Sequence, residues 1–285
     1  MVLEQYNING KVVKLDRFLR QKLDNVKKIV KRNWDCVMLI DGVERSGKSN
    51  LGLSCGWYLT DGKMKVSDIC IGADDVIKKI GNAKEGSLLM LDESSLVFYS
   101  KDSMKKEQKK LIKILNVVGQ KNIIFIMILP SVFDLMKDIA VRRSKFLLHV
   151  YTGRHLERGR YSYFSEKKKR ILYEKGKKNF GSYGFPQANF VGRFEKFNPF
   201  GQDYLDVKNK TLLHTLELDI IAIENPIKMR KAILMGVLKN LNEFEKTKKL
   251  KKIEKAVILG VKPASMTVYA RDLREITRFK DKIVN

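Results

Sequence analysis

The chain has 285 residues, of which 44% are hydrophobic, so it can bury a full core and wholesale disorder is excluded. Lysine and arginine number 57 against 32 aspartate and glutamate, which gives a formal net charge of +25. This excess favours a polyanionic partner such as nucleic acid, because basic side chains that neutralise phosphates release condensed counterions. A well-solvated basic surface is the alternative.

Cysteine usage and hydropathy indicate the compartment. The three cysteines, Cys36, Cys55 and Cys70, have no CxxC spacing, which argues against a zinc site and a disulfide framework. Residues 1–12 are mixed and polar, unlike a signal peptide. The longest apolar run, 123–129, is too short to cross a bilayer. We therefore expect a cytoplasmic protein with no membrane span.

The predicted elements alternate between helices and strands. In chain order they are a helix at 14–33, a strand at 36–41, a helix at 48–59, a strand at 65–71, a helix at 74–80, a strand at 87–92, a basic helix at 104–118, a strand at 122–129, a helix at 131–140, a strand at 145–151 and a hairpin at 160–174. The long strands are apolar throughout, which is typical of a parallel sheet covered on both faces. The predicted fold class is therefore α/β, with a parallel sheet flanked by helices.

Three regions follow from this pattern. Residues 1–33 form an amphipathic helical segment, 34–204 the core, and 205–285 a basic helical region. Within the core, 175–204 interleaves aromatic residues with Gly, Pro and basic residues, and no helix or strand period holds there. We expect this stretch to be an irregular excursion packed on the core, with stacking on nucleic-acid bases as the alternative.

A phosphate-binding loop is the strongest motif. The stretch Gly42-Val43-Glu44-Arg45-Ser46-Gly47-Lys48-Ser49 fits G-x-x-x-x-G-K-[ST], between a predicted strand and a predicted helix. Its amide groups and the helix N-terminus are expected to bind the phosphates of a nucleoside triphosphate, most simply ATP. Arg45 within the loop and Asn50 after it are further candidates for contact with the nucleotide, and a solvated Arg45 is the alternative. Lys48 is expected to reach the β- and γ-phosphates, and Ser49 to ligate Mg²⁺.

An acidic pair ends the predicted strand at 87–92. A carboxylate at this end of a parallel strand lies where ligands of such sheets bind. Asp92 is expected to hold Mg²⁺, and Glu93 to polarise the attacking water as a general base. The pair indicates hydrolysis of ATP; two surface acids at a strand end are the alternative.

The two motifs together resemble the additional-strand, catalytic-glutamate class of P-loop ATPases, which has a RecA-like core. Within it, the stretch from Ile124 to Ser131 and the later Asp138–Ser144 resemble the FtsK–HerA branch of DNA pumps and viral packaging ATPases, and zonular-occludens-toxin-like phage proteins. The resemblance covers roughly residues 34–175. It implies a homo-oligomeric ring, for example a hexamer, in which ATP binds between subunits.

The resemblance also directs attention to a sensor and an arginine finger. The branch has a Thr-Gln pair at the end of the strand that corresponds to 122–129 here. This chain has Leu129-Pro130-Ser131 at that place, so the sensor candidates are Ser131 and, in the preceding turn, Gln120. Arg142 and Arg143 are the candidates for a finger that stabilises transition-state charge in a neighbouring subunit. A basic pair preceding a strand is the alternative.

The carboxy-terminal region predicts a DNA-binding element. In 247–275, an alanine, a glycine four residues later and a following valine match the turn of a helix-turn-helix. The residues available to a major groove would be Ser265, Thr267, Val268 and Arg271. A basic helical hairpin that serves packing or oligomer contacts is the alternative.

Three functions compete for this sequence. The first is an ATP-hydrolysing motor or remodeller that translocates, packages or transfers DNA. The second is an ATP-gated DNA-binding protein, such as a helicase loader or transposition accessory, that does not translocate. The third is a small-molecule kinase with a lid at 154–160, against which the pair Asp92-Glu93 argues.

Overall fold

The computed structural model describes residues 3–71, 73–92 and 104–210. The chain divides into two compact units, Met1–Lys208 and Asn209–Asn285. The strands described below and the helices that cover them belong to the first unit. Glu93 and the predicted helix-turn-helix at 247–275 lie outside the described residues.

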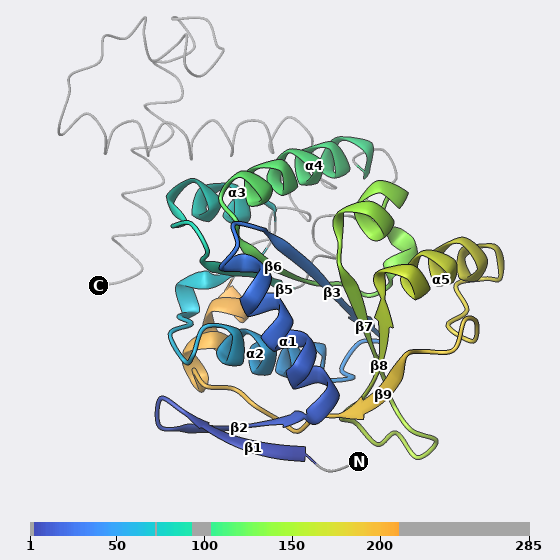
Figure 1. Cartoon of the computed structure of the whole chain (residues 1–285), viewed down its shortest axis with the longest axis horizontal. Helices are drawn as coiled ribbons and strands as arrows, with labels where there is room; N and C mark the ends of the chain where they lie inside the picture. The colour runs from blue at the N-terminus through green and yellow to red at the C-terminus, as the bar shows by residue number, and fades with distance from the viewer. Residues whose placement is uncertain (1–2, 72, 93–103, 211–285) are drawn as a thin grey trace, which may run out of the picture. The chain divides into compact units, whose positions relative to one another are not determined.

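A seven-stranded mixed sheet occupies the centre of the first unit, in the order β4-β5-β6-β3-β7-β8-β9 (Figure 1). The first five strands in this order run parallel, and β8 and β9 extend the sheet in antiparallel fashion. The strands are β3 Cys36–Gly42, β4 Ile69–Ile71, β5 Leu88–Asp92, β6 Ile124–Ile128, β7 Phe146–Tyr151, β8 Arg160–Ser165 and β9 Phe190–Arg193. The predicted α/β class with a mostly parallel sheet is confirmed, and β6 lies between β3 and β5.

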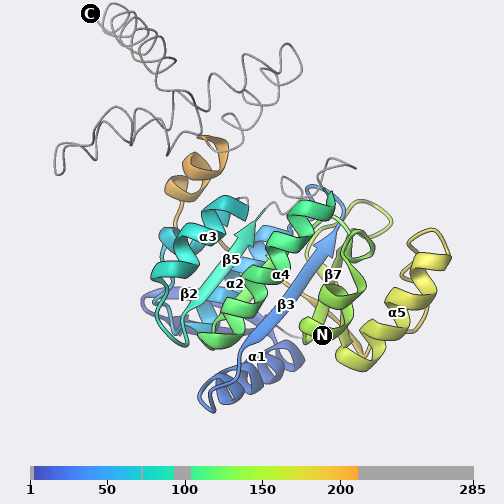
Figure 2. The same cartoon turned by 90° about the horizontal axis from the view of Figure 1, so that it is seen from above.

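Helices cover both faces of the sheet (Figures 1 and 2). On one face lie α1 (Arg17–Val30) and α2 (Lys48–Leu59), and on the other α3 (Ala73–Asn82), α4 (Met104–Gln120) and α5 (Glu166–Lys178). Two hydrophobic clusters result, one for each face. Alternate residues of β3 enter different clusters, Met38 and Ile40 on the α2 side and Val37 and Leu39 on the other. This double burial explains why the strand is apolar throughout.

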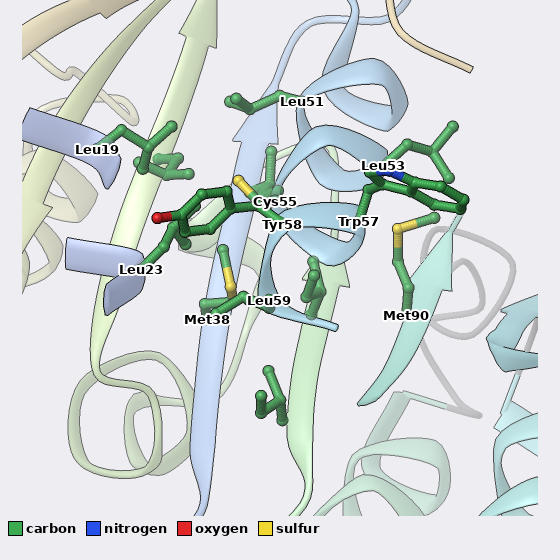
Figure 3. Packing of buried hydrophobic residues seen from close by; sticks show 14 of the residues in the cluster. Leu19, Leu23, Met38, Leu51, Leu53, Cys55, Trp57, Tyr58, Leu59 and Met90 are labelled. Carbon is green, nitrogen blue, oxygen red and sulfur yellow. The ribbon is translucent and has the colours of Figure 1, made fainter. Parts of the chain in front are cut away.

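The cluster beneath α1 and α2 holds the phosphate-loop helix against the sheet. Leu19 and Leu23 of α1 meet Tyr58 of α2 there, above Met38 of β3 (Figure 3). These leucines and Met38 are fully buried. Burial of core side chains of this size stabilises the fold by about 1.5–3 kcal/mol each, so these contacts hold α2 on the sheet.

The N-terminal region differs from the prediction. A hairpin of β1 (Leu3–Ile8) and β2 (Lys11–Asp16) precedes α1, so the helix predicted from residue 14 begins at Arg17. The turn is Asn9-Gly10, with both residues at positive φ, which is the geometry that two-residue hairpin turns require. Asp16 then caps α1 by accepting a hydrogen bond from the Phe18 amide at 2.9 Å.

Two later predictions were wrong in part. The helix predicted at 131–140 is divided into a 3₁₀ turn, η3 (Val132–Asp134), and a π-helix, η4 (Asp138–Arg143). The chain is extended at Leu135, whose carbonyl accepts a 2.6 Å hydrogen bond from Tyr173. The predicted second arm of the hairpin at 160–174 belongs to α5, because β8 pairs with β7 instead and the buried positions of α5 follow a helical spacing.

The excursion at 175–204 contains β9, which its mixed composition did not predict. Its first residues belong to α5, Phe194 and Tyr204 are buried in the cluster on the α2 side, and Phe180 and Phe185 are exposed. All three cysteines are free and buried, and burial raises the pKa of each thiol to about 12. Among the described residues, no helix has both the length and the hydropathy needed to cross a bilayer.

Candidate nucleotide-binding site

The phosphate loop connects the end of β3 to the start of α2, as predicted. Its backbone depends on glycine at Gly42, which has φ 140° and lies so close to β7 that a Cβ would be 2.0 Å from the Val150 oxygen. Gly47, at φ 103°, is the N-cap of α2. The exposed tip comprises Val43, Glu44 and Arg45. The loop therefore presents the N-terminus of a 12-residue helix to the space above the sheet.

Lys48 lies inside the loop. Its ammonium group donates to the backbone oxygens of Gly42 at 2.7 Å and Val43 at 2.8 Å. The Ser46 hydroxyl also donates to the Val43 oxygen, at 2.8 Å. The lysine is thus held at the centre of the loop, in reach of the space that phosphates would occupy. Asn50, the third residue of α2, supplies its carbonyl to the Ser54 hydroxyl within the helix.

Ser49 and Asp92 meet in the structure although 43 residues separate them. The Ser49 hydroxyl lies 3.0 Å and 3.2 Å from the two carboxylate oxygens of Asp92. Asp92 ends β5 and is 1% exposed. Both residues were assigned to Mg²⁺ from the sequence, and the fold brings them to the same edge of the sheet.

The donor set fits magnesium. A hydroxyl and a carboxylate are hard oxygen ligands, and magnesium in phosphate sites is bound by one or two such groups, together with phosphate oxygens and water. Among the described residues, no cluster of three or more His, Cys, Asp or Glu side chains is suited to a metal. A cation here would therefore take its remaining ligands from the nucleotide and solvent.

Two residues that the sequence did not single out also contact Asp92. Tyr204 donates its hydroxyl to Oδ2 of Asp92, and the Lys208 ammonium lies 3.3 Å from the same oxygen. Both belong to a helix that begins at Gln202. Their spacing of four residues places them on one helix face, a signal that is visible in sequence but does not specify a partner.

The segment from Phe194 to Lys208 follows the phosphate loop and α2. The Phe194 ring lies next to Gly47, where a Cβ would be 3.2 Å from its Cε2. Further on, Phe197 and Phe200 contact the Trp57 ring of α2, with centroids 6.2 Å and 6.1 Å apart. The segment then reaches Asp92 through Tyr204. We call residues 194–208 the site-covering segment.

A second polar cluster adjoins the loop on the opposite face of the sheet. Asp41, fully buried beside Gly42, accepts hydrogen bonds from the Val132 amide at 2.8 Å and from the Tyr183 hydroxyl, and pairs with Nδ1 of His149 at 2.9 Å. The rings of His149 and Tyr183 stack with centroids 3.5 Å apart. Burial and the neighbouring carboxylate raise the pKa of Tyr183, so its hydroxyl stays protonated. The sequence analysis missed this cluster.

The cluster fixes the loop that carries one sensor candidate. Ser131 is the N-cap of η3, and the preceding Pro130 accepts a hydrogen bond from the Gly42 amide at 3.2 Å. Ser131 therefore adjoins the first residue of the phosphate loop. Gln120 ends α4, four residues before β6 begins, at the amino edge of the parallel strands and away from the loop. Of the two candidates, the geometry favours Ser131.

The two arginine-finger candidates have different surroundings. Arg143 pairs with Asp35 at 2.5 Å and donates to the Leu115 oxygen at 2.7 Å, so its guanidinium is engaged within its own chain. Arg142 has a side chain that is 79% exposed, with Asp138 at 3.2 Å. Both line a pocket of about 250 Å³ between α4 and η4. Of the pair, Arg142 is accessible to a neighbouring molecule.

Four arginines gather at the carboxyl edge of β7, next to the phosphate loop. Arg154 and Arg158 lie exposed in the turn between β7 and β8, and Arg160 of β8 faces Arg193 of β9. One carboxylate, that of Glu157, lies among them: a Cβ on Gly153 would be 1.7 Å from a Glu157 oxygen and 3.6 Å from the guanidinium carbon of Arg160. Like charges opposite one another in a sheet are unfavourable unless an anion neutralises them.

No protein-family model matches the sequence, and no curated protein matches it. Two solved structures were found as similar folds at low scores. A DNA polymerase III gamma subunit-related protein of Thermotoga maritima is 16% identical, with a TM-score of 0.32, and the match covers 47% of each chain. The chain thus spans about half the length of that protein. The replication initiator DnaA, bound to AMPPCP and single-stranded DNA, is 14% identical with a TM-score of 0.34, over 93% of this chain and 90% of that chain.

Proposed function

We propose that this protein hydrolyses ATP and uses the free energy of hydrolysis to act on DNA, as an oligomeric motor that translocates, packages or transfers the nucleic acid. The observation that carries the nucleotide part is the meeting of Ser49 and Asp92 at 3.0 Å below a loop that holds Lys48. Lys48 and Ser49 of the loop and Asp92 of β5 thereby lie at the same edge of the sheet, which is the arrangement that a magnesium–triphosphate site uses.

Each residue has a defined part in this mechanism. The loop amides and the α2 N-terminus bind the phosphates, and Lys48 exchanges its carbonyl partners for β- and γ-phosphate oxygens. Ser49 and Asp92 hold Mg²⁺, which when bound supplies positive charge to the phosphates. Glu93, the next residue along the chain, accepts a proton from the attacking water. Ser131 contacts the γ-phosphate or this water.

Support for a DNA partner comes from charge. The net charge is +25, and the arginines at 154, 158, 160 and 193 outnumber Glu157, the one carboxylate of the turn between β7 and β8, at the same edge as the nucleotide loop. Phosphates of a nucleic acid would neutralise this group with release of counterions. Ser265, Thr267, Val268 and Arg271 remain proposed as further contacts with DNA.

The test is ATP turnover with and without double-stranded DNA. We expect DNA to stimulate the wild type. Lys48→Ala should lose nucleotide binding, whereas Asp92→Asn and Glu93→Gln should bind ATP but turn it over at least about a hundredfold more slowly, since they lack groups that act on the transition state. A wild type that shows no turnover under any of these conditions contradicts the proposal.

An ATP-gated DNA-binding protein that does not translocate is the second candidate, because the same site and the same basic group serve a switch equally well. A triplex-displacement assay separates the two. Displacement of a third strand in one direction, dependent on ATP, identifies a motor. ATP-dependent DNA binding without displacement identifies a switch.

A further inference from the structure

We propose that Lys208 is a ligand of the bound triphosphate, held on Asp92 until the nucleotide arrives. This inference rests on the proposed nucleotide site and adds to it a residue from the site-covering segment. Asp92 is 1% exposed and ends a strand on which Ser49 and Tyr204 also converge. Lys208 brings a cation to this buried carboxylate, at 3.3 Å from Oδ2.

The buried carboxylate of Asp92 needs positive charge close to it. A carboxylate removed from water is strongly unfavourable unless a cation or several donors compensate it. Lys208, whose side chain is only 22% exposed, supplies that cation within the chain. The hydroxyl donors of Ser49 and Tyr204 complete the surroundings of Asp92.

Binding of a magnesium–triphosphate complex would change the electrostatic surroundings of Lys208. Asp92 then serves the dication, directly or through water, and an ammonium group a few ångströms away is repelled by it. The incoming triphosphate carries more negative charge than one carboxylate. The favoured partner of the ammonium group therefore becomes a phosphate oxygen, and the flexible four-carbon stem of lysine permits the transfer.

The helix that carries Lys208 is anchored by aromatic side chains that precede this lysine. Tyr204, one turn earlier, is 4% exposed and belongs to the hydrophobic cluster on the α2 side. Before it, Phe197 and Phe200 pack on Trp57. The helix is thus fixed at its start, and Lys208 lies one turn further along, with a side chain that is 22% exposed. A firmly packed backbone that carries a cation on a long stem suits a residue that exchanges the carboxylate for a phosphate oxygen.

The test compares Lys208→Met with the matched control Lys210→Met, which removes an exposed lysine from the same helix. Binding of a fluorescent ATP analogue and of its ADP counterpart is measured with Mg²⁺ present. We expect Lys208→Met to weaken ATP binding about tenfold relative to ADP, the value of one charge-assisted hydrogen bond. Lys208→Arg should restore most of the preference, and Lys210→Met should leave it unchanged.

A purely structural ion pair gives a different result. Lys208→Met would then lower the thermal stability of the nucleotide-free protein but leave the ratio of ATP to ADP affinity unchanged, and this outcome overturns the proposal. Circular dichroism establishes that the variant is folded. Failure of the wild type to bind either nucleotide refutes the proposed nucleotide site itself, so the two failures are distinguishable.

A second readout reports on the site-covering segment. The chain has two tryptophans, and Trp34→Phe leaves Trp57, which contacts Phe197 and Phe200, as the sole indole. Addition of Mg²⁺ and ATP should change the Trp57 emission in this background. The same addition should change it less when Lys208→Met is also present. An equal change in both backgrounds contradicts a role for Lys208 in coupling the segment to the nucleotide.

Discussion

We expect the stability of this protein to rise with pH between about 7 and 8.5 because of one buried lysine. Lys169 of α5 is fully buried and donates hydrogen bonds to the backbone oxygen and the hydroxyl of Ser144. Burial lowers its pKa from the ordinary 10.5 to about 7, Glu166 opposes this shift, and Lys145 adds to it.

The sign follows from proton binding in each state. Between pH 7 and 10.5 the unfolded chain holds a proton on Lys169 that the folded chain lacks, so raising the pH favours the folded state. Below about pH 7 both states are protonated and the contribution of Lys169 is flat. The difference between 10.5 and about 7 corresponds to about 5 kcal/mol at about 1.4 kcal/mol per pKa unit, of which roughly 2 kcal/mol falls below pH 8.5.

Chemical denaturation at a series of pH values measures this effect. The comparison variant is Lys169→Met, which keeps the buried methylene chain and removes the titrating group. We expect the free energy of unfolding of the wild type to increase over this range, while that of the variant changes much less. The window stops at pH 8.5 because burial raises the pKa of the thiols of Cys36, Cys55 and Cys70 to about 12, which acts in the opposite direction from about pH 9 upward. Equal slopes for the wild type and the variant would refute the reasoning.

Three further predictions concern the loop and its surroundings. Gly42→Ala should destabilise the fold by more than about 3 kcal/mol in denaturant unfolding, because its Cβ would lie 2.0 Å from a backbone oxygen of β7. Gly81→Ala, whose Cβ would have no neighbour within 4 Å, should instead stabilise α3 by up to about 1 kcal/mol. Similar effects of the two substitutions would contradict a steric role for Gly42. Arg158→Ala should weaken DNA binding in fluorescence anisotropy for all sequences alike and reduce the salt slope by about 1, and an unchanged slope would exclude a phosphate contact. Arg142→Ala should abolish ATP turnover in a uniform assembly. Mixing with inactive Lys48→Ala subunits should restore part of it, since an interface whose loop comes from an Arg142→Ala subunit and whose arginine comes from a Lys48→Ala subunit is intact; no restoration argues against a shared site.

The sequence predicted the parts of the site that depend on local pattern. The loop, the strand before it and the helix after it are contiguous, and apolar runs identify strands buried on both faces. The pairing of Ser49 with Asp92 was also predictable, because both residues lie at the carboxyl edge of parallel strands.

The contacts that the sequence did not predict are long-range. Tyr204 and Lys208 reach Asp92 from 112 and 116 residues further along, and no periodicity specifies that return. Asp41 and Tyr183 are 142 residues apart, joined only when the irregular stretch folds against η3. The helix α5 was mistaken in part for a strand because a short apolar run within basic residues fits either period, and the burial of Lys169 decides for the helix.

The path of the site-covering segment has a consequence for synthesis of the protein. Every residue of the phosphate loop and Asp92 has left the ribosome long before Tyr204 and Lys208, which complete the surroundings of that carboxylate. A nascent chain therefore carries Asp92 without its cation until residue 208 has emerged, and the face of α2 that Phe197 and Phe200 cover stays open to other apolar surfaces until those residues arrive. A chain cut at residue 193, at the end of the sheet, would keep the whole sequence motif and remain in that incomplete state.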